Sequence, residues 1–433
     1  MMGKLRFATC ASVLGLGASF FTAGNALASG FALREESAEG LGNAFAGQTA
    51  KAYNASTAYY NPAGMSNLDQ DEVAGTVTWI APQSKFTGSN SNPLGGKVAG
   101  EQPNNAIKAA AVGTLFGVYK LNPDWNLGMS VAAPFGMRSD YKDDWVGRYQ
   151  ALHSDVTDIE FSPTLSYKID NHWSVGGGPR VDYLDATLSQ AVNQTALTGG
   201  ALGTLQDAGA KVWGDDSGIG YVASTLYKFD DDTRAGLTYR SRMEHKLQGS
   251  VQFSNVNVNL ANSLVSQDAS AKITLPDSLL FGLYHDINEH LAVMSDVSWT
   301  GWSTFKNLNV VGANGTTVNA TPENWHDTYF VSLGANYKPD EKWVFHTGVA
   351  FDQSPVRDAY RTARIPDSSR YWTAFGTTYN ISTAMNVNVA YAHLFADKAS
   401  INEEASATAG TGTLTGSYDN SVDIVSASFV LKF

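Results

Sequence analysis

Basic side chains alternate with other residues in the segment 233–248, which reads TRAGLTYRSRMEHKLQ. Successive side chains of a β-strand point to opposite faces, so Arg240, Arg242 and Lys246 are predicted to form one row. If the strand crosses a membrane, the row should face the lumen, because an Arg or Lys facing lipid at the midplane costs about 2–4 kcal/mol. There it could bind a carboxylate, and a guanidinium can do so through two parallel hydrogen bonds.

A second interpretation of the basic row stays open. Arg180 shares its parity with Asp182 in another strand-like segment and is added to the candidate ligand-binding residues. The same cations could instead form a structural charge lattice with facing acids such as Glu160 and Asp182, since lumenal charges commonly serve that role.

Signatures of catalysis are absent from the sequence. The eight His residues are scattered, and neither an H-E-x-x-H motif nor a G-x-S-x-G elbow occurs. The only cysteine, Cys10, lies near the N-terminus, so the rest of the chain has no thiolate for a metal site. No enzyme activity, metal or cofactor is expected. A catalytic pair assembled across strands remains the alternative, and its histidine would be His153, His245, His326 or His393.

The elements that must position these residues are predicted to be β-strands. From about Asp71 onward, apolar residues recur at every second position, as in the C-terminal segment 421–433. Seven hairpins joined by six short turns give about 14 strands, and longer polar stretches lie at the opposite ends. The short turns are expected at 122–125, 170–172, 230–232, 288–290, 339–342 and 380–383. Short turns at one end and long loops at the other are typical of outer-membrane barrels.

Composition favours the same class of fold. Charged residues make up 16% of the 433 residues, against about 25% in a typical soluble protein. Beyond the N-terminal segment, no apolar run approaches the roughly 18 residues of a spanning helix. The fold predicted is an all-β, transmembrane antiparallel β-barrel of about 14 strands, closed because unpaired backbone groups in lipid are costly. A formal net charge of −12 argues against nucleic acid as a partner.

Residues 1–28 have the features of a secretory signal peptide. Lys4 and Arg6 form a basic start, an apolar stretch follows, and the small residues of the site ALA at 26–28 suit a signal peptidase. Cleavage is expected before Ser29.

Residues 29–70 show no strand pattern. They are too short for an independent domain and lack the high charge of a disordered tail. A barrel of about 14 strands has a lumen too wide for its own side chains to fill. Residues 29–70 are therefore predicted to fold inside the lumen as a hatch, with residues 71–433 as the barrel; a periplasmic tail is the alternative. The hatch residues selected as functional are Phe45, Tyr59, Tyr60, Asn61, Pro62 and Ala63.

Three stretches occur together and in order: SGFALREESAEGLGNAFAGQTAKAYNASTAYYNPAGMSNL at 29–68, AGLTYRSRMEHKLQG at 235–249 and GVAFDQSPVRDAYRTARIPDSSRYW at 348–372. They resemble the FadL-like long-chain fatty acid transporters of the Gram-negative outer membrane, a family that includes importers of aromatic hydrocarbons. The resemblance implies a 14-stranded barrel with an N-terminal hatch. It also implies passive uptake, in which a hydrophobic ligand is captured outside, held at an internal apolar site, and released sideways through the wall.

The resemblance places the lateral opening in the third strand, within NLGMSVAAPFGMRSD at 126–140. The odd-numbered residues from Leu127 to Phe135 are predicted to face lipid. Pro134 has no N–H for the ladder, and within sheets Pro occurs at edges or bulges. A break is therefore expected at Ala133, Pro134 and Gly136, and a structural bulge is the alternative.

The expected ligand is a long-chain fatty acid or another hydrophobic small molecule. Aromatic hydrocarbons or alkanes are alternative substrates, and a hydrophilic diffusion porin is the alternative class of protein. The protein is expected to be a monomer that crosses the outer membrane many times, in contact with outer-membrane lipid and lipopolysaccharide.

We predict that the assembled protein begins at Ser29 and that Phe433→Asp impairs its insertion. The C-terminal strand ends in an aromatic residue after apolar alternation, and a carboxylate would disrupt that face. N-terminal sequencing of the outer-membrane protein and the yield of folded variant measure the two effects. An N-terminal Met1, or normal assembly of the variant, would contradict the respective claim.

Overall fold

The computed structural model describes residues 30–404 and 411–433; the predicted signal peptide and the cleavage site at Ser29 lie outside these residues. Twenty strand segments join into one antiparallel sheet with fourteen spans, eight continuous and six interrupted. The continuous spans are β1 (Glu72–Asn90), β2 (Ala110–Lys120), β5 (His153–Lys168), β6 (Trp173–Val192), β7 (Ala208–Lys228), β16 (Trp343–Asp352), β17 (Arg370–Ser382) and β20 (Leu414–Lys432). The interrupted spans are β3 (Trp125–Ala132) with β4 (Gly136–Asp140), β8 (Thr233–Arg240) with β9 (Met243–Ser254), β10 (Gln267–Leu275) with β11 (Ser278–Asp286), β12 (Leu291–Thr300) with β13 (Asn307–Gly312), β14 (Thr317–Pro322) with β15 (Thr328–Tyr337), and β18 (Met385–Ala396) with β19 (Ala399–Glu403).

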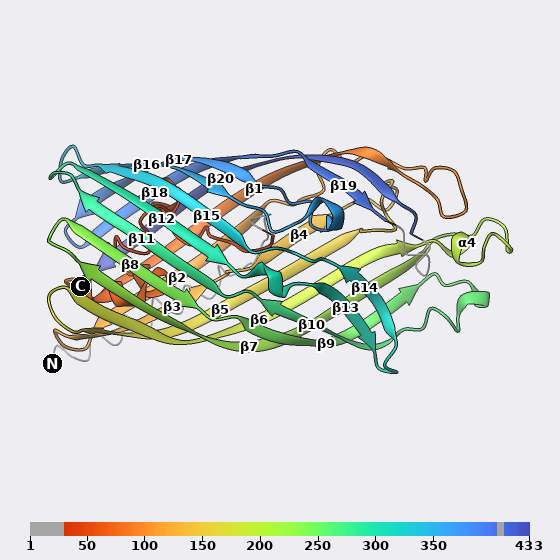
Figure 1. Cartoon of the computed structure of the whole chain (residues 1–433), viewed down its shortest axis with the longest axis horizontal. Helices are drawn as coiled ribbons and strands as arrows, with labels where there is room; N and C mark the ends of the chain where they lie inside the picture. Colours follow the sequence, from red (N-terminus) through yellow and green to blue (C-terminus); the bar gives the residue numbers. More distant parts are fainter. Residues whose placement is uncertain (1–29, 405–410) are drawn as a thin grey trace.

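The sheet closes on itself as an elongated barrel (Figure 1). The first and last strands, β1 and β20, pair along their whole length, from Glu72↔Lys432 to Asn90↔Leu414. This closure leaves no sheet edge open to lipid, where each unpaired backbone group would cost several kcal/mol. The predicted all-β antiparallel barrel of 14 strands is confirmed.

Side chains alternate between the lumen and the outer surface along each strand. In β1, Val77 and Trp79 are 46% and 51% exposed, whereas Thr78 and Ile80 are buried. This is the period of two that the sequence shows, and it places the apolar face toward lipid and a mixed face toward the lumen.

The two ends of the barrel differ as the sequence predicts. Strands are joined by short turns at one end, on the left in Figure 1, and by longer loops at the other. Strands extend into two of these longer connections. The region 310–325 continues as the β13–β14 hairpin, and β6 and β7 extend far into the region 190–216. The short helix α4 (Gln194–Leu197) lies in the connection between β6 and β7.

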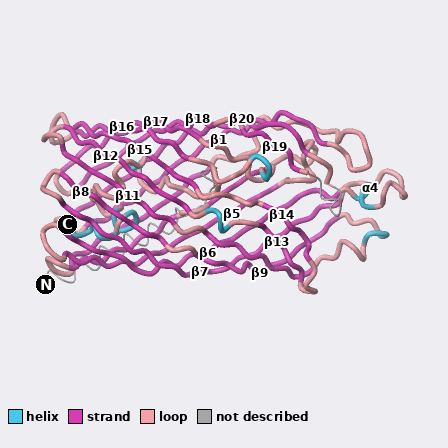
Figure 2. Tube along the Cα trace, viewed as in Figure 1, coloured by secondary structure: helices cyan, strands magenta, loops and turns pink. Residues whose placement is uncertain are grey.

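The residues that precede β1 lie in the lumen, where they are largely buried and bonded to strands on different sides of the barrel. In Figure 2 their helices fall within the outline of the barrel. They form α2 (Ala38–Gly42), α3 (Thr57–Tyr60) and the 3₁₀ helix η1 (Pro62–Asn67). Ser37 caps α2 by accepting the Gly40 N–H. Three further 3₁₀ turns lie in the barrel: η2 (Val258–Leu260), η3 (Trp302–Thr304) and η4 (Asp358–Tyr360). None of the helices in residues 30–404 and 411–433 is long and apolar enough to span a bilayer.

The hatch approaches the wall closely where the wall carries glycine. A Cβ on Gly236 of β8 would overlap the backbone carbonyl oxygen of Thr49, and one on Gly348 of β16 would overlap that of Asn43. Backbone atoms cannot move aside as a flexible side chain can, so these glycines permit the contact between the hatch and the wall.

We predict that Gly236→Ala displaces the hatch and raises the single-channel conductance of the purified barrel. The added methyl group meets the Thr49 carbonyl, and the hatch must shift to accommodate it. Gly117→Ala in β2 is the matched control, because its Cβ would meet no atom within 4 Å. Equal conductance of the two variants would contradict the proposed fit of the hatch.

Candidate ligand-binding site

The wall of the barrel is interrupted at Pro134. β3 pairs with β2 as far as Leu115↔Val131, whereas β4 pairs with β5 from Gly136↔Thr157 onward. Three residues between the two strands, Ala133 to Phe135, leave the ladder. Pro134 supplies no N–H to a neighbouring strand, which accounts for the position of the break.

The hatch covers this break. Leu33 donates its N–H to the Pro134 carbonyl, and Gly136 donates its N–H to the Phe31 carbonyl, each at 2.8 Å. Ala32 lies opposite Phe135 as an isolated antiparallel bridge. A segment of the hatch therefore pairs with backbone groups that lack a wall partner at the break.

The break also changes which way its residues point. Ala133 and Phe135 were predicted to face lipid, but each is only 7% exposed. Phe135 instead packs inside the barrel against Phe31 and Trp302, with ring centroids 5.8 Å and 6.0 Å away. The prediction was wrong for these two residues because strict alternation does not continue through the irregular backbone.

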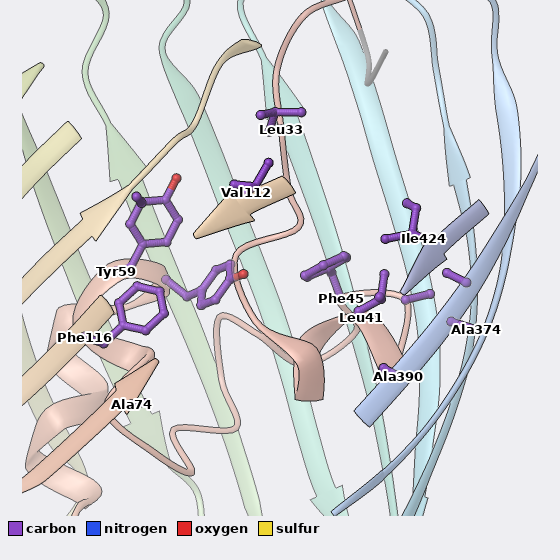
Figure 3. Packing of buried hydrophobic residues seen from close by; sticks show 14 of the residues in the cluster. Leu33, Leu41, Phe45, Tyr59, Ala74, Val112, Phe116, Ala374, Ala390 and Ile424 are labelled. Atoms are coloured by element: carbon purple, nitrogen blue, oxygen red, sulfur yellow. The ribbon is translucent and has the colours of Figure 1, made fainter. Parts of the chain in front are cut away.

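An inner cavity with an empty volume of about 890 Å³ lies between the hatch and the wall beside the break. Figure 3 shows part of its surroundings, with Leu33, Phe45 and Tyr59 of the hatch near the barrel strands. Its apolar and aromatic lining includes Leu33, Phe45, Tyr59, Tyr60, Pro134, Phe135, Leu280 and Phe330. Its charged lining comprises Arg34, Glu36, Arg180, Arg240 and Asp296. The cavity is therefore apolar over much of its surface with charged groups gathered at particular points.

Arg180 and Arg240 both contact the cavity, and both bind the same carboxylate. Arg180 donates from Nε and Nη2 to Oε2 of Glu160 at 2.9 Å and 2.5 Å, and Arg240 Nη2 donates to Oε1 at 2.5 Å. Arg240 also donates to the Tyr59 carbonyl of the hatch at 3.1 Å. This geometry matches the charge-lattice alternative, in which the two arginines tie together β5, β6, β8 and the hatch.

Arg242 and Lys246 lie outside the lumen. The span is interrupted after Arg240, and the alternation resumes with the opposite parity, so Met243, His245 and Leu247 are buried. The Arg242 side chain is 53% exposed and pairs with Asp277 at 3.4 Å, and Lys246 is exposed. The single lumenal row predicted from the sequence is wrong beyond Arg240, because a one-residue slip moves every later side chain to the other face.

An outer cavity of about 830 Å³ lies nearer the long loops. Most of its lining is aliphatic, from Met137, Val156, Leu184, Leu188, Val212, Leu247, Ile273 and Val310. Arg364 lies at its edge and donates hydrogen bonds to the His153 carbonyl at 3.2 Å and to Gln190 Oε1 at 2.8 Å. Burial lowers the pKa of Arg364 to about 10, so the guanidinium is charged at neutral pH.

Five aromatic rings, which we call the aromatic partition, lie where the two cavities meet: Phe31, Phe135, Trp302, Phe305 and Trp325. Phe31 lies 4.9 Å from Trp302 and 5.7 Å from Trp325 between ring centroids. Phe31 and Phe305 line the outer cavity, while Phe135 lines the inner one. The partition therefore contains a hatch residue held among wall residues.

The selected hatch residues divide into two groups. Phe45, Tyr59 and Tyr60 line the inner cavity. Asn61 binds backbone: its side chain donates to the Thr49 carbonyl at 2.6 Å and the Thr225 carbonyl at 3.1 Å, and it accepts the Ala63 N–H at 3.1 Å.

The second group, Asn61, Pro62 and Ala63, lies at the end of the hatch and contacts the wall. Pro62 is the first residue of η1, where its fixed φ is tolerated. Ala63 donates its N–H to the Ser224 hydroxyl at 3.0 Å and accepts the Ser174 hydroxyl proton at 2.9 Å. These contacts hold the motif around Asn61 to strands β6 and β7.

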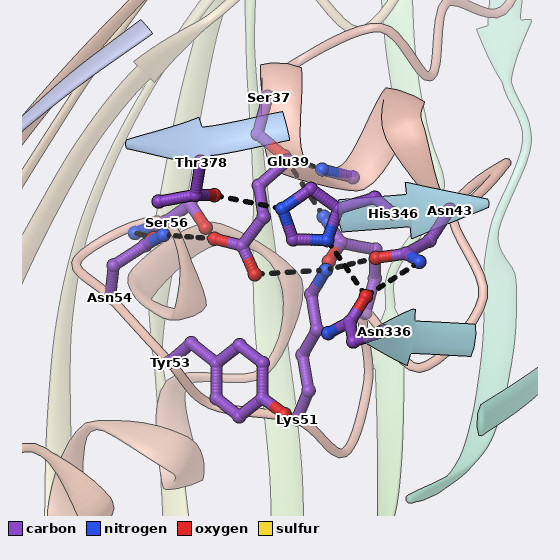
Figure 4. Close-up of polar contacts among 12 residues, drawn as sticks. Ser37, Glu39, Asn43, Lys51, Tyr53, Asn54, Ser56, Asn336, His346 and Thr378 are labelled. Atoms are coloured by element: carbon purple, nitrogen blue, oxygen red, sulfur yellow. Dashed lines mark hydrogen bonds and ion pairs between the residues drawn. The ribbon is translucent and has the colours of Figure 1, made fainter. Parts of the chain in front are cut away.

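A polar network fixes the opposite side of the hatch to the wall (Figure 4). Asn43 donates to Asn336 Oδ1 at 2.9 Å, and the His346 ring lies 2.7 Å from the same oxygen. Within the hatch, Lys51 pairs with Glu39 at 3.3 Å. The hatch is thus bonded to strands on two sides of the lumen.

Three features of the site were missed in the sequence: Arg34, Glu36 and the aromatic partition. Arg34 and Glu36 were not selected because a hatch without periodicity gives no parity from which to judge the direction of a side chain. Their charge could have identified them, because Arg34, Glu35 and Glu36 are three adjacent charged residues in a segment predicted to lie inside the barrel.

A closed barrel with a hatch in its lumen and two apolar cavities defines a plugged outer-membrane transport barrel. The chain belongs to the family described as outer membrane protein transport protein (OMPP1/FadL/TodX), whose model matches residues 19–433. The protein therefore lies in the outer membrane, which it crosses many times.

Individual relatives agree with this assignment. The long-chain fatty acid transport protein of Escherichia coli O6:H1 is 28% identical over 409 residues, which cover 89% of this chain and 91% of that protein. The crystal structure of a Pseudomonas aeruginosa FadL homologue is 25% identical, with a TM-score of 0.87, and covers 93% of this chain and 100% of its own. The Pseudomonas putida toluene transporter TodX shows the same fold, with a TM-score of 0.67 at 18% identity and coverage of 94% and 100%.

We predict that Glu160→Gln lowers the free energy of unfolding by about 3–5 kcal/mol, because two buried guanidinium groups lose the charge that compensates them. The measurement is thermal or denaturant unfolding of the purified barrel in detergent. Asp358→Asn is the matched control, since Asp358 also pairs with an arginine but its side chain is 79% exposed. Equal stability of the two variants would contradict the structural role of Glu160.

Proposed function

We propose that the protein mediates passive uptake of long-chain fatty acids across the outer membrane, by external capture, rearrangement of the hatch and lateral exit. One observation carries the proposal: two apolar cavities lie in series, and the inner one ends at a break in the wall that a hatch segment covers. The long-chain fatty acid transport protein of Escherichia coli O6:H1 is a relative over most of both chains and supports this choice of ligand.

Capture begins at the outer cavity, which lies near the long loops expected to face the exterior. Its aliphatic lining can bury an alkyl chain, and each buried methylene contributes about 0.8 kcal/mol. Arg364 and Glu323 are the charged residues that line this cavity, and Arg364 carries the positive charge that a carboxylate requires. Its present hydrogen bonds go to neutral oxygens of His153, Ser154 and Gln190, so an anion would be a better partner.

Passage inward requires the hatch to move. Phe31 belongs to the aromatic partition, and its carbonyl accepts the Gly136 N–H at the break. Displacement of residues 31–33 would therefore open the partition and uncover the break together. This shared segment supports hatch rearrangement as the step that connects the two cavities.

Exit through the break leads into the bilayer and not into the periplasm. A ladder break in lipid is tolerated where it is covered by protein or lines a cavity, and here both conditions hold while the hatch is in place. A ligand that leaves sideways never crosses water, which suits a long alkyl chain.

Two alternatives predict different behaviour. Uptake of aromatic hydrocarbons or alkanes would use the same apolar cavities but would need no charged group. A hydrophilic diffusion porin is disfavoured by the hatch, whose residues are largely buried within the lumen. Growth of a deletion strain on oleate or on aromatic hydrocarbons as sole carbon source separates the substrates.

We predict that sealing the break abolishes uptake while binding persists. Pro134→Val with Gly136→Ala restores an N–H and stiffens the strand, so β3 and β4 can continue as one ladder. Uptake of radiolabelled oleate by cells should fall, and oleate binding to the purified variant should remain at the level of the wild type. Full uptake through a variant whose structure shows a continuous wall would exclude lateral exit.

A further inference from the structure

The two arginines that line the deep side of the inner cavity are already neutralised. Arg180 and Arg240 hold the single carboxylate of Glu160 between them, and their side chains are 3% and 10% exposed. The remaining donors are also occupied, because Arg180 Nη1 binds the Ser241 carbonyl at 2.9 Å and Arg240 Nη1 binds the Tyr59 carbonyl at 3.1 Å. A ligand carboxylate could bind either guanidinium only by displacing Glu160, which is itself buried.

Arg34 presents a different kind of cation to the same cavity. It lies on the hatch before α2, and its guanidinium carbon is 4.2 Å from the centre of the Phe330 ring. Among residues 30–404 and 411–433, no carboxylate forms an ion pair with the Arg34 guanidinium, and the guanidinium donates no hydrogen bond. The Phe330 ring favours the cation but leaves its N–H donors unused.

The backbone of Arg34 is held in place although its charge is not paired. Its N–H donates to Glu35 Oε2 at 2.8 Å, and its carbonyl accepts the Tyr60 hydroxyl at 3.3 Å. On its N-terminal side, Leu33 is bonded to Pro134. The guanidinium is therefore positioned in the cavity by its surroundings, which reduces the entropy that a ligand must supply on binding.

Two carboxyl groups share the cavity with Arg34, and neither compensates it. Asp296 accepts the N–H and the hydroxyl of Thr49. Glu36 is fully buried, and both of its carboxyl oxygens lack a hydrogen-bond partner among the described residues. Burial, with smaller contributions from Glu35 and Glu160, raises the pKa of Glu36 to about 8, so most of this group is uncharged at pH 7.

We propose that Arg34 is the residue that binds the carboxylate of the ligand in the inner cavity, and that it selects singly charged anionic amphiphiles over neutral hydrocarbons of the same length. The proposal rests on the proposed function, since it names the head-group contact for the ligand of the same cavity. The alkyl chain would pack along Leu33, Phe45, Leu280 and Phe330, which line the cavity with Arg34.

The selectivity follows from the cost of an unpaired charge. A guanidinium in an apolar cavity lacks the partners that it has in water, so a carboxylate supplies both charge and acceptors. An alcohol or hydrocarbon supplies no charge and leaves this cost in place. A cavity with a partly buried charged group that needs a partner therefore discriminates against a ligand that lacks one.

The experiment compares oleate with oleyl alcohol, which has the same chain without the carboxylate, by calorimetry on the full-length purified barrel. Arg34→Gln keeps a polar side chain but removes the charge. Oleate affinity should fall about ten- to a hundredfold, the range for one charge-assisted hydrogen bond, while affinity for the alcohol stays within about twofold. Arg34→Lys should recover part of the loss, because it restores the charge without the bidentate geometry.

Controls keep the outcomes distinct. Arg357→Gln removes an arginine that is exposed on a loop and should bind oleate as the wild type does. Unfolding of each variant in detergent verifies that the barrel is intact. If the wild type binds oleate and Arg34→Gln binds it equally well, the assignment of Arg34 is overturned while the proposed function stands. If the wild type binds neither ligand, the proposed function itself is overturned.

Discussion

The need to pair every backbone group at membrane depth governs this structure. The β1–β20 ladder meets it for the barrel as a whole. Other interrupted spans meet it within the wall: at the β8–β9 break, Ser241 donates its N–H to the Tyr221 carbonyl of β7. The β3–β4 break differs, because β5 supplies a partner on one side through the Asp158 N–H, and the hatch supplies the partners on the other. The wall is therefore complete only with the hatch in position.

The buried charges of the Glu160 lattice in the lumen are also paired with one another. Glu160 holds Arg180 and Arg240 together, and the three residues come from three different strands. One of these arginines also binds the hatch, so the lattice fixes the wall and the plug with one set of contacts. Burying such a group is tolerable only when all of it is bonded. A cation in the same space without an anionic partner, such as Arg34, stands out against this background because it does not contribute to that lattice.

The fold could be predicted from the sequence because its signals are repeated over many strands. Period-two alternation, turn spacing and the unpatterned residues 29–70 all indicate one architecture, so an irregular residue changes little. The faces of individual side chains could not be predicted past a break. Pro134 is a sequence signal for the break between β3 and β4. The break at Ser241 and Arg242 contains neither Pro nor Gly, so the sequence gives no sign that the buried and exposed faces exchange there. Arg242 and Lys246 were misplaced for that reason, whereas Arg240, which precedes the break, and Arg180, which lies in the continuous strand β6, face the lumen as predicted.

The hatch rearrangement proposed above would involve the part of the hatch that has the fewest bonds to the wall. The α2 side is bonded to the wall through Asn43, and the η1 side is bonded to it through Asn61 and Ala63. Glu35 and Glu36 are tied by their carbonyls to Thr78 and Thr114. Residues 31–33 make two backbone hydrogen bonds to the break and otherwise rely on packing of aromatic rings.

Aromatic packing is non-directional, and an alkyl chain can replace it with little loss of buried apolar area. The backbone bonds are different, since each group left without a partner in an apolar site carries a cost. A ligand that displaces residues 31–33 therefore gives up little by replacing the rings but must leave Pro134 and Gly136 unpaired. In the uptake that we propose, the open state is therefore higher in energy than the closed one and is sustained only while ligand occupies the site. Under the same proposal, residues 31–33 pair with the break again once the ligand has left.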